Sequence, residues 1–407
     1  MHTLPVVTFS DEPGAPSPDG LIPLSVPEIR GNEWKYVKEC LDTGWVSSVG
    51  PFVERFEREM ATYVGANYAV ALINGTAALH TALKVIGIEP NDEVIVSNLT
   101  FVAPVNAIRY CQAHPVLIDA SPATWQMDVD KVERFLAQEC YTEGKACYNR
   151  RTRRRVRAIL PVHILGLACE IDRIVELAQR YGLLVVEDAA EALGVRFRGR
   201  HVGTFGDMGI FSFNGNKVIT AGGGGMLVTN NRRYAEYARY LTTQAKDDAL
   251  EYLHNEIGYN YRLSNIQAAV GVAQLERLDE FVSRKKAIAR AYHQALYDFH
   301  AVATMPTPPH CEPTYWLYSI LLSPGTTLER RKSVIQHLQN KGIGARPLWH
   351  TIHDLPAYRD CQGYQIENSV HLYERGVSLP SSVGLAPGDL EKCVAGLKEI
   401  LSKNSAI

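Results

Sequence analysis

Lys217 stands in a stretch without neighbouring charges, FSFNGNKVITAGGGG. Most lysines lie in charged, solvated segments, so we expect this one to be partly buried. Desolvation favours the neutral amine, which can form a Schiff base with a carbonyl compound and later carry a proton. A surface lysine beside a glycine turn is the alternative. The glycine run lacks the G-x-G-x-x-G spacing of a dinucleotide-binding loop, so we reject that interpretation.

Two acids end an apolar stretch in LLVVEDAAE, and the second of them is Asp188. Ligands of open α/β sheets bind outside the carboxyl ends of the strands, so Asp188 would stand where a cofactor lies. A carboxylate there can pair with a pyridinium nitrogen and keep it protonated, which makes the ring an electron sink. An acid that only caps the following turn is the alternative.

A short segment of small residues, Asn74-Gly75-Thr76-Ala77-Ala78, lies between a predicted strand and a predicted helix. Unpaired backbone N–H groups and a partial positive charge at a helix N-terminus can hold a phosphate, and the Thr76 hydroxyl adds a donor. A plain helix cap with a tight turn is the more frequent meaning of so short a pattern.

The segment GYNYRLS, residues 258–264, precedes a long helical stretch. Its aromatic and amide groups suit a site at the edge of a subunit. A helix-entry loop with Ser264 as N-cap fits equally well. By itself this segment does not decide between the two.

These groups need a framework, and apolar runs alternate with helix-like stretches through the first half of the chain. The strand-like runs are YAVALI, DEVIVS, PVLIDA, RAILPV and LLVVEDA. Such alternation predicts parallel strands joined by crossover helices. Helical spacing from Ser264 to Tyr297 predicts a connector, and strand-like YWLYSILL with later helices predicts a smaller α+β domain. We therefore expect a mobile tail at residues 1–20, a large domain at 21–260, a connecting helix at 261–300 and a small domain at 301–407.

The composition is that of an ordinary globular protein. The 407 residues include 42 Lys and Arg against 44 Asp and Glu, which favours neither nucleic acid nor a membrane as partner. The eight cysteines form no C-x-x-C pair, and the first twenty residues do not resemble a signal peptide, so a reducing cytoplasm is expected. No apolar run reaches the roughly 18 residues of a transmembrane helix.

Three further polar features receive plain interpretations. The basic run at residues 150–157, between a predicted helix and RAILPV, is interpreted as a solvated loop because it has no aromatic platform for bases. His163 follows a strand and faces either the pocket or the core. His350 and His353 lack a third ligand at metal-site spacing, so no metal is predicted.

Together these segments resemble the sugar-nucleotide aminotransferases of the DegT/StrS family. The resemblance begins at Ile22 and runs through GWVSSVGPFVERFE, NGTAALHTAL, LTFVAPVNAI, PVHILG, VEDAAEALG, GTFGDMGIFSFNGNKVITAGGGGML, GYNYRLSNIQAAVG and ARPLWHTIH. It implies the aspartate-aminotransferase-like α/β fold, fold type I, in which a mostly parallel sheet is joined to a smaller C-terminal α+β domain. It also implies pyridoxal 5′-phosphate as cofactor.

Carried over position by position, the resemblance implies the site residues. Lys217 would form the internal aldimine, Asp188 would hold the pyridine nitrogen, and Glu191 would lie beside the ring. Phe101 would stack on the cofactor, and the phosphate would be bound by Gly75, Thr76, Ala77 and Ser212, with Asn260 reaching it from the neighbouring subunit of a homodimer. The sugar-nucleotide site would be bordered by Trp45, Ser47, Arg346, Trp349 and His353.

The segments VEDAAEALG, FNGNK and RPLW resemble the branch that aminates 4-keto-6-deoxy sugars, including the bacillosamine and legionaminic-acid pathway enzymes. The implied substrate is UDP-2-acetamido-4-keto-2,4,6-trideoxyhexose or a GDP counterpart, with glutamate as donor, for bacterial glycan biosynthesis. A 3-keto sugar nucleotide is an alternative, and a non-catalytic regulator that binds the cofactor is another. The intact Lys217 and Asp188 argue against the regulator. Lys217 also argues against the family branch that has histidine there and removes a hydroxyl, while Glu191 replaces the family's frequent His or Gln.

Overall fold

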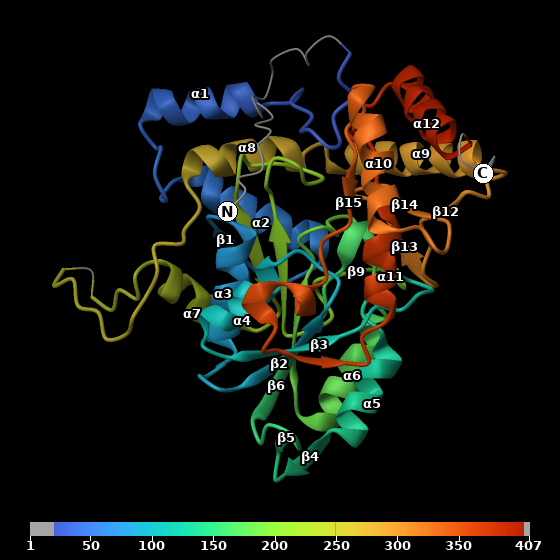
Figure 1. Cartoon of the computed structure of the whole chain (residues 1–407). Coiled ribbons are helices and arrows are strands. Elements are labelled where there is room, and N and C mark those ends of the chain that lie inside the picture. The colour runs from blue at the N-terminus through green and yellow to red at the C-terminus, as the bar shows by residue number, and fades with distance from the viewer. Residues whose placement is uncertain (1–19, 249, 403–407) are drawn as a thin grey trace, which may run out of the picture.

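The computed structural model describes residues 20–248 and 250–402. The mobile tail expected at residues 1–20 lies outside the described residues except for its last member. In the described part of the chain, a large mixed sheet has ten strands, eight of them in the order β1-β11-β10-β7-β6-β2-β3-β16, and hairpin β4–β5 joins it through β6 (Figure 1). Their bounds are β1 Tyr68–Leu72, β2 Glu93–Ser97, β3 His114–Ile118, β4 Cys140–Glu143, β5 Ala146–Asn149, β6 Arg155–Leu160, β7 Leu184–Asp188, β10 Met208–Ser212, β11 Gly225–Thr229 and β16 Gln362–Tyr364.

All five apolar runs expected to be strands form strands of this sheet, namely β1, β2, β3, β6 and β7. The pairs from β10 through β7, β6, β2 and β3 to β16 are parallel, which confirms a mostly parallel sheet. Two strands depart from this: β11 runs antiparallel to both β1 and β10, and β5 runs antiparallel to both β4 and β6. Because β10 and β11 are joined by a loop, the segment that contains Lys217 crosses the carboxyl edge of the sheet.

Helices cover the large sheet and are amphipathic where they touch it. In α6, the buried residues are Ile171, Ile174, Leu177 and Ala178, which share one helical face. Helices α3, α4 and α7 pack together, and α5 packs on α6 (Figure 1). The bounds are α1 Glu33–Thr43, α2 Pro51–Val64, α3 Gly75–Val85, α4 Ala103–Tyr110, α5 Val129–Gln138, α6 Ile171–Tyr181 and α7 Arg232–Thr242.

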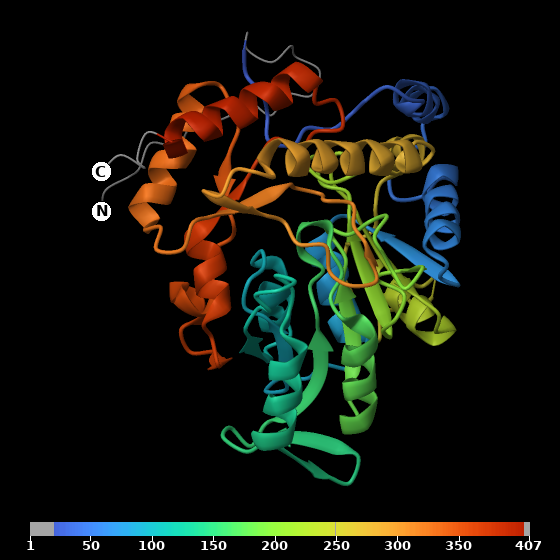
Figure 2. The ribbon, with the colours of Figure 1, turned by 90° about the vertical axis from the view of Figure 1, so that its right-hand side faces the viewer.

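The C-terminal part builds a second sheet in the order β12-β14-β17-β15, with helices α10, α11 and α12 beside it (Figure 2). The bounds are β12 Val302–Thr304, β14 Ser319–Leu322, β15 Arg346–Pro347, β17 Gly376–Ser378, α10 Leu328–Asn340, α11 Asn368–Arg375 and α12 Pro387–Ser402. A third, small sheet has β13 Cys311–Glu312, β8 Arg196–Phe197 and β9 Arg200–His201. Short 3-10 helices span Ile164–Gly166, Ile352–Asp354 and Pro356–Tyr358.

The two parts of the chain are tied together by more than the connector. Strand β16, which belongs to the segment expected to be the small domain, pairs with β3 and thereby covers an edge of the large sheet. Asp119, one residue after β3, accepts backbone N–H groups of Glu367, Asn368 and Ser369 at the start of α11. The buried ammonium of Lys131 donates to the same carboxylate over 2.6 Å.

Three local expectations differ from the structure. The stretch expected as one connector helix forms two helices, α8 Asn265–Leu275 and α9 Leu278–Leu296, because Arg277 leaves the helical conformation with φ −113 and ψ 6. In YWLYSILL only Ser319–Leu322 is a strand. The basic run follows hairpin β4–β5, in which Gly144 with φ 60 turns the chain, rather than a helix. Only residues 150–154 of the run form the expected loop, because Arg155 begins β6.

Candidate active site

Asp188 ends β7 and its side chain lies at the carboxyl edge of the large sheet. The residue is only 3% exposed, and its Oδ1 accepts the N–H of Ala190 over 3.0 Å. Burial raises the pKa of the Asp188 carboxyl, and the Ala190 hydrogen bond and the Lys217 charge oppose this shift. A buried carboxylate with few protein donors is suited to a cationic partner from a ligand.

Lys217 lies in the loop between β10 and β11, where its N–H donates to Asn214 O. Its side chain is 14% exposed, and its Nζ lies 3.6 Å from Oε1 of Glu191. The lysine is therefore mostly buried, as its uncharged neighbours in the sequence predict. The structure thus brings Lys217 of the FNGNK segment close to Asp188 and Glu191 of the VEDAAE segment.

Glu191 completes this cluster from the turn that follows β7. Its Oε2 accepts the N–H of Leu165 over 2.9 Å, and the residue is 5% exposed. Burial raises the pKa of the Glu191 carboxyl to about 7, although the positive charge of Lys217 pulls it down. Near neutral pH this side chain can therefore exchange a proton, which a fully solvated glutamate does not do there.

The N-terminus of α3 lies against the end of β10. A Cβ at Gly75 would be 3.1 Å from Ser212 Cβ and 3.3 Å from its Oγ, so any larger residue there would press on Ser212. Asn74 Oδ1 accepts the N–H of Ala77 over 2.8 Å. This helix cap therefore occupies an N–H group that the family resemblance assigns to the phosphate. The N–H groups of Gly75 and Thr76 are in the first turn, where helices have no internal partner. This arrangement fits a small anion.

Two predicted residues lie near the end of β2. Phe101 precedes α4 and is 53% exposed, so its ring can meet a ligand. Asn98 Oδ1 accepts the backbone N–H of His353 over 3.0 Å, which brings a C-terminal residue to the carboxyl edge of the large sheet. Arg346 in β15 is exposed and Trp349 is partly buried.

The remaining predicted residues are placed around the entry of α8. Backbone carbonyls of Trp45 and Ser47 accept hydrogen bonds from Asn265, over 2.8 Å and 2.6 Å. Trp45 is 50% exposed. Asn260 is also exposed, and its backbone forms an isolated antiparallel β-bridge with Thr243. Among the contacts described for residues 20–248 and 250–402, none joins Trp45, Ser47 or Asn260 to the lysine cluster.

Sequence reasoning missed two residues of this region. Glu187, which precedes Asp188, is fully buried and is bonded to His163, so that histidine belongs to the core rather than to the pocket. Trp316 places its ring 3.8 Å from Lys217 Nζ. The ED pair could have pointed to the first of these. The second comes from a distant segment and has no local signal.

The comparisons with known proteins agree with this geometry. The model of the DegT/DnrJ/EryC1/StrS aminotransferase family matches residues 27–398, and the chain belongs to this family. The chain is 40% identical over 384 residues to GDP-perosamine synthase of Caulobacter vibrioides, which covers 93% of this chain and 98% of that protein. GDP-perosamine synthase of Escherichia coli O157:H7 is 40% identical over 371 residues, with 90% and 94% covered.

Solved structures confirm the fold. The structure of S. venezuelae DesV in complex with a ketimine intermediate superimposes with a TM-score of 0.81 at 31% identity and covers 91% of this chain and 94% of that one. The protein is thus a sugar aminotransferase of fold type I that uses pyridoxal phosphate, as the resemblance implied. The buried Asp188 carboxylate, the mostly buried Lys217 amine and the glycine-lined cradle at Ser212 fit this cofactor.

None of the helices in the part of the chain that the structure describes is long and apolar enough to cross a membrane. Within the same residues, no group of three or more His, Cys, Asp or Glu side chains is arranged to hold a metal ion.

Proposed function

We propose that this protein transfers an amino group from glutamate to C4 of a GDP-linked 4-keto-6-deoxy sugar for glycan biosynthesis. The names of two relatives support the nucleotide and the amino-sugar product, since both are GDP-perosamine synthases at 40% identity. This choice departs from the UDP-linked sugar that the bacillosamine and legionaminic-acid resemblance favours. The UDP-linked counterpart is kept as the second substrate to be tested.

The observation that carries the proposal is the cluster of Lys217, Asp188 and Glu191 at one edge of the sheet. Bound pyridoxal phosphate supplies the electron sink that lets a C–H bond beside nitrogen break. Asp188 pairs with the ring nitrogen and keeps it protonated. Lys217 holds the cofactor between reactions, and its Nζ takes the proton from the donor carbon and returns a proton to C4 of the sugar.

The phosphate of the cofactor is assigned to the cradle between α3 and β10. Gly75 and Thr76 donate backbone N–H groups, and the hydroxyls of Thr76 and Ser212 add donors. Ala77 faces the same end of the helix, but its N–H is already bonded to Asn74. Phe101 stacks on one face of the ring and excludes water from it.

The nucleotide sugar is assigned to a site that segments of both predicted domains would form. This site would be bordered by Trp45, Ser47, Arg346, Trp349 and His353. Arg346 offers a fork of donors for phosphate oxygens, and Trp349 offers an aromatic face. Of these, His353 is held next to the large sheet by Asn98.

A homodimer with shared sites is part of the proposal, in which Asn260 of the partner subunit completes the phosphate site. Its support is a set of exposed apolar side chains just before Asn260. Leu250 is 89% exposed, Ile257 88% and Tyr252 71%. Apolar groups at this exposure on a projecting segment need a covering surface. Light scattering of the purified protein should give twice the mass of the 45.2 kDa chain.

The test of the reaction is mass spectrometry of products after incubation with glutamate, pyridoxal phosphate and one of three substrates: a GDP-linked 4-keto-6-deoxy sugar, its UDP-linked counterpart, or a 3-keto sugar nucleotide. An amine at C4 of the GDP sugar supports the proposal in full. Amination of the UDP sugar alone corrects the nucleotide, and amination of only 3-keto sugars replaces the proposal with that alternative.

Two lysine variants make the assignment specific. Lys217→Ala should abolish turnover and the covalent attachment of cofactor by borohydride. Lys145→Ala, at an exposed position of hairpin β4–β5, should leave both unchanged. Attachment of cofactor to Lys217→Ala would contradict the role given to Lys217.

A further inference from the structure

The free amine of Lys217 has a defined resting place in this structure. On one side, its Nζ lies 3.8 Å from the centroid of the Trp316 ring. On the other, Oε1 of Glu191 is 3.6 Å away. Trp316 is 3% exposed, so the contact between the cation and the ring is shielded from water. A cation over an indole face is attracted by the ring quadrupole, and more strongly when both are desolvated.

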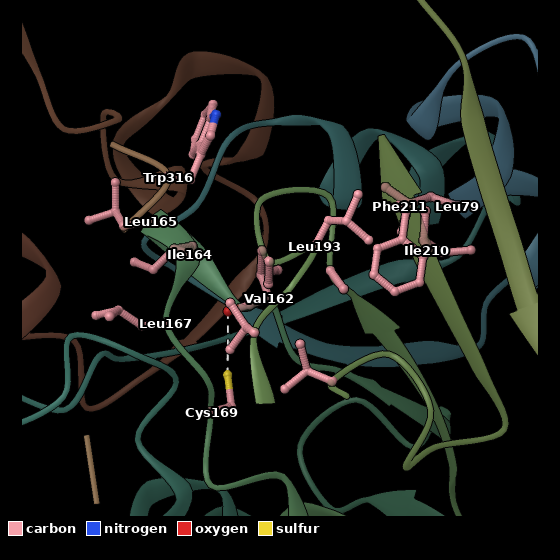
Figure 3. Close-up of a cluster of buried hydrophobic side chains, with 14 of the residues drawn as sticks. Leu79, Val162, Ile164, Leu165, Leu167, Cys169, Leu193, Ile210, Phe211 and Trp316 are labelled. Carbon is pink, nitrogen blue, oxygen red and sulfur yellow. Dashed lines mark hydrogen bonds between the residues drawn. The ribbon is translucent and has the colours of Figure 1, made fainter. Parts of the chain in front are cut away.

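Trp316 is held by hydrogen bonds to its ring and to its backbone. Its indole Nε1 donates to Asn216 O over 2.6 Å, and its backbone N–H donates to Leu165 O over 3.1 Å. The buried ammonium of Lys285 donates to Trp316 O over 2.8 Å. Figure 3 shows the indole beside Leu165, with Ile164 and Leu167 of the same apolar cluster below them in the view. Two of these bonds hold the backbone of Trp316, and the bond from Nε1 holds the ring itself.

One residue links the two groups that receive the lysine. Leu165 donates its N–H to Oε2 of Glu191 and accepts the N–H of Trp316 with its carbonyl. Its φ of 59 lies in the left-handed region, which residues other than glycine rarely adopt. The surrounding structure thus maintains an unfavourable backbone conformation in which the two polar groups of Leu165 point to Glu191 and to Trp316.

We propose that Trp316 is a positioning residue that docks the ammonium of Lys217 between its ring face and the Glu191 carboxylate whenever the lysine is released from the cofactor. The inference rests on the proposed role of Lys217 and deepens it. A free lysine has a long flexible chain, and an unrestrained amine would leave the reacting carbon. Docking keeps the proton-carrying Nζ beside the site until the proton is returned.

The test measures the reactivity of Lys217 in the full chain loaded with pyridoxamine 5′-phosphate, a form in which the lysine is not bonded to the cofactor. Trace acetylation followed by peptide mass spectrometry gives the labelling of Lys217 relative to exposed Lys145. Trp316 is replaced by mono-, di- and trifluorotryptophan, which weakens the attraction for a cation in steps and nearly preserves the shape of the ring. We expect labelling to rise at each step, to about tenfold for the trifluoro ring. Unchanged labelling across the series overturns the proposal.

Two ordinary variants separate the ring face from the tether to Asn216. Trp316→Phe keeps an aromatic face and loses the N–H, so labelling should stay within about twofold of the native chain. Trp316→Leu loses the aromatic face, so the labelling of Lys217 should be as high as with the trifluoro ring or higher. Equal rises in Phe and Leu, with a flat fluorinated series, would reduce Trp316 to a packing role and overturn the proposal.

The failure of the proposed function gives a different result. If borohydride fixes the cofactor to a lysine other than Lys217, the assignment of Lys217 is wrong whatever the labelling shows. If the cofactor is fixed to Lys217 and the fluorinated series is flat, the assignment of Lys217 stands and only the docking by Trp316 fails.

Discussion

His163 and Glu187 form a fully buried pair in which Nε2 lies 3.1 Å from Oε2. The backbone N–H of Cys169 donates to Nδ1, so the hydrogen on this ring is at Nε2 and points to Glu187. The same carboxylate accepts the N–H groups of Gly203, Phe205 and Gly206, each over 2.7 Å. Glu187 thus anchors a loop and a histidine directly under Asp188.

Glu187→Gln should destabilise the protein because the amide offers one acceptor atom where the carboxylate offers two. The NH₂ group of the glutamine would face N–H donors, which it cannot accept, and the charge-assisted hydrogen bonds of the carboxylate would be lost. We expect a loss of roughly 2–4 kcal/mol in the free energy of unfolding, measured by urea denaturation. Glu143→Gln, on exposed hairpin β4–β5, is the matched control. A loss of the same small size in both variants would contradict the anchoring role.

Asp188→Asn should separate stability from function. Burial raises the pKa of this carboxyl, which means that burial disfavours its charged form. The amide oxygen can still accept from Ala190, so the cofactor-free variant should melt at a temperature equal to or above that of the native chain. Pyridoxal phosphate should then raise the melting temperature less in the variant, and turnover should fall by about 100-fold or more. A variant that melts lower without cofactor and is stabilised normally with it would contradict this assignment.

Glu191 makes the stability of the cofactor-free protein depend on pH. Burial raises its pKa to about 7, so between pH 4.5 and 7 the folded state binds more protons than the unfolded state. The resulting stability is present at pH 4.5 and is lost as pH rises through 7, by about 3 kcal/mol at most. As the pH rises from 4.5 to 8, the melting temperature of Glu191→Gln should therefore rise relative to that of the native chain. A difference that is constant with pH would contradict the raised pKa.

Gly75 should be required for space in the phosphate cradle. In Gly75→Ala the new Cβ would lie 3.1 Å from Ser212 Cβ, so the start of α3 or the end of β10 must shift. We expect the affinity for pyridoxal phosphate to fall about tenfold, measured by absorbance titration. Gly215→Ala is the control, because no atom lies within 4 Å of its added Cβ. Equal affinities in the two variants would place the phosphate elsewhere.

Much of this fold could be predicted from the sequence because its signals are local. The apolar runs and the helix that begins after Asn74 are readable in short windows, and the order of motifs gave the family. The antiparallel direction of β11 was not readable, since it depends on which neighbours a strand meets. Tyr315 and Trp316 have strand-forming side chains, yet Trp316 N–H pairs with distant Leu165 and the strand begins only at Ser319. Contacts of this kind become visible only when both segments are folded.

Lys285 gives the last prediction, because it is a fully buried lysine whose described partners are carbonyls. Its Nζ donates to Trp316 O over 2.8 Å and to Ser381 O over 2.7 Å. Burial lowers the pKa of this ammonium to about 7. Between pH 7 and 10.5 the unfolded state therefore binds more protons than the folded state, and the native chain gains stability as pH rises through this window.

Lys285→Met removes this dependence and also the anchor of the Trp316 carbonyl. Between pH 7 and 9.5, we expect the melting temperature of the native chain to rise by several degrees relative to that of the variant. This corresponds to a gain of a few kcal/mol in the free energy of unfolding. Lys398→Met, on the C-terminal helix α12, is the control and should track the native chain. Because the anchor is lost at every pH, acetylation of Lys217 in Lys285→Met should also exceed that of the native chain. A pH-independent difference in melting temperature would mean that Lys285 remains charged in the core at pH 9.5.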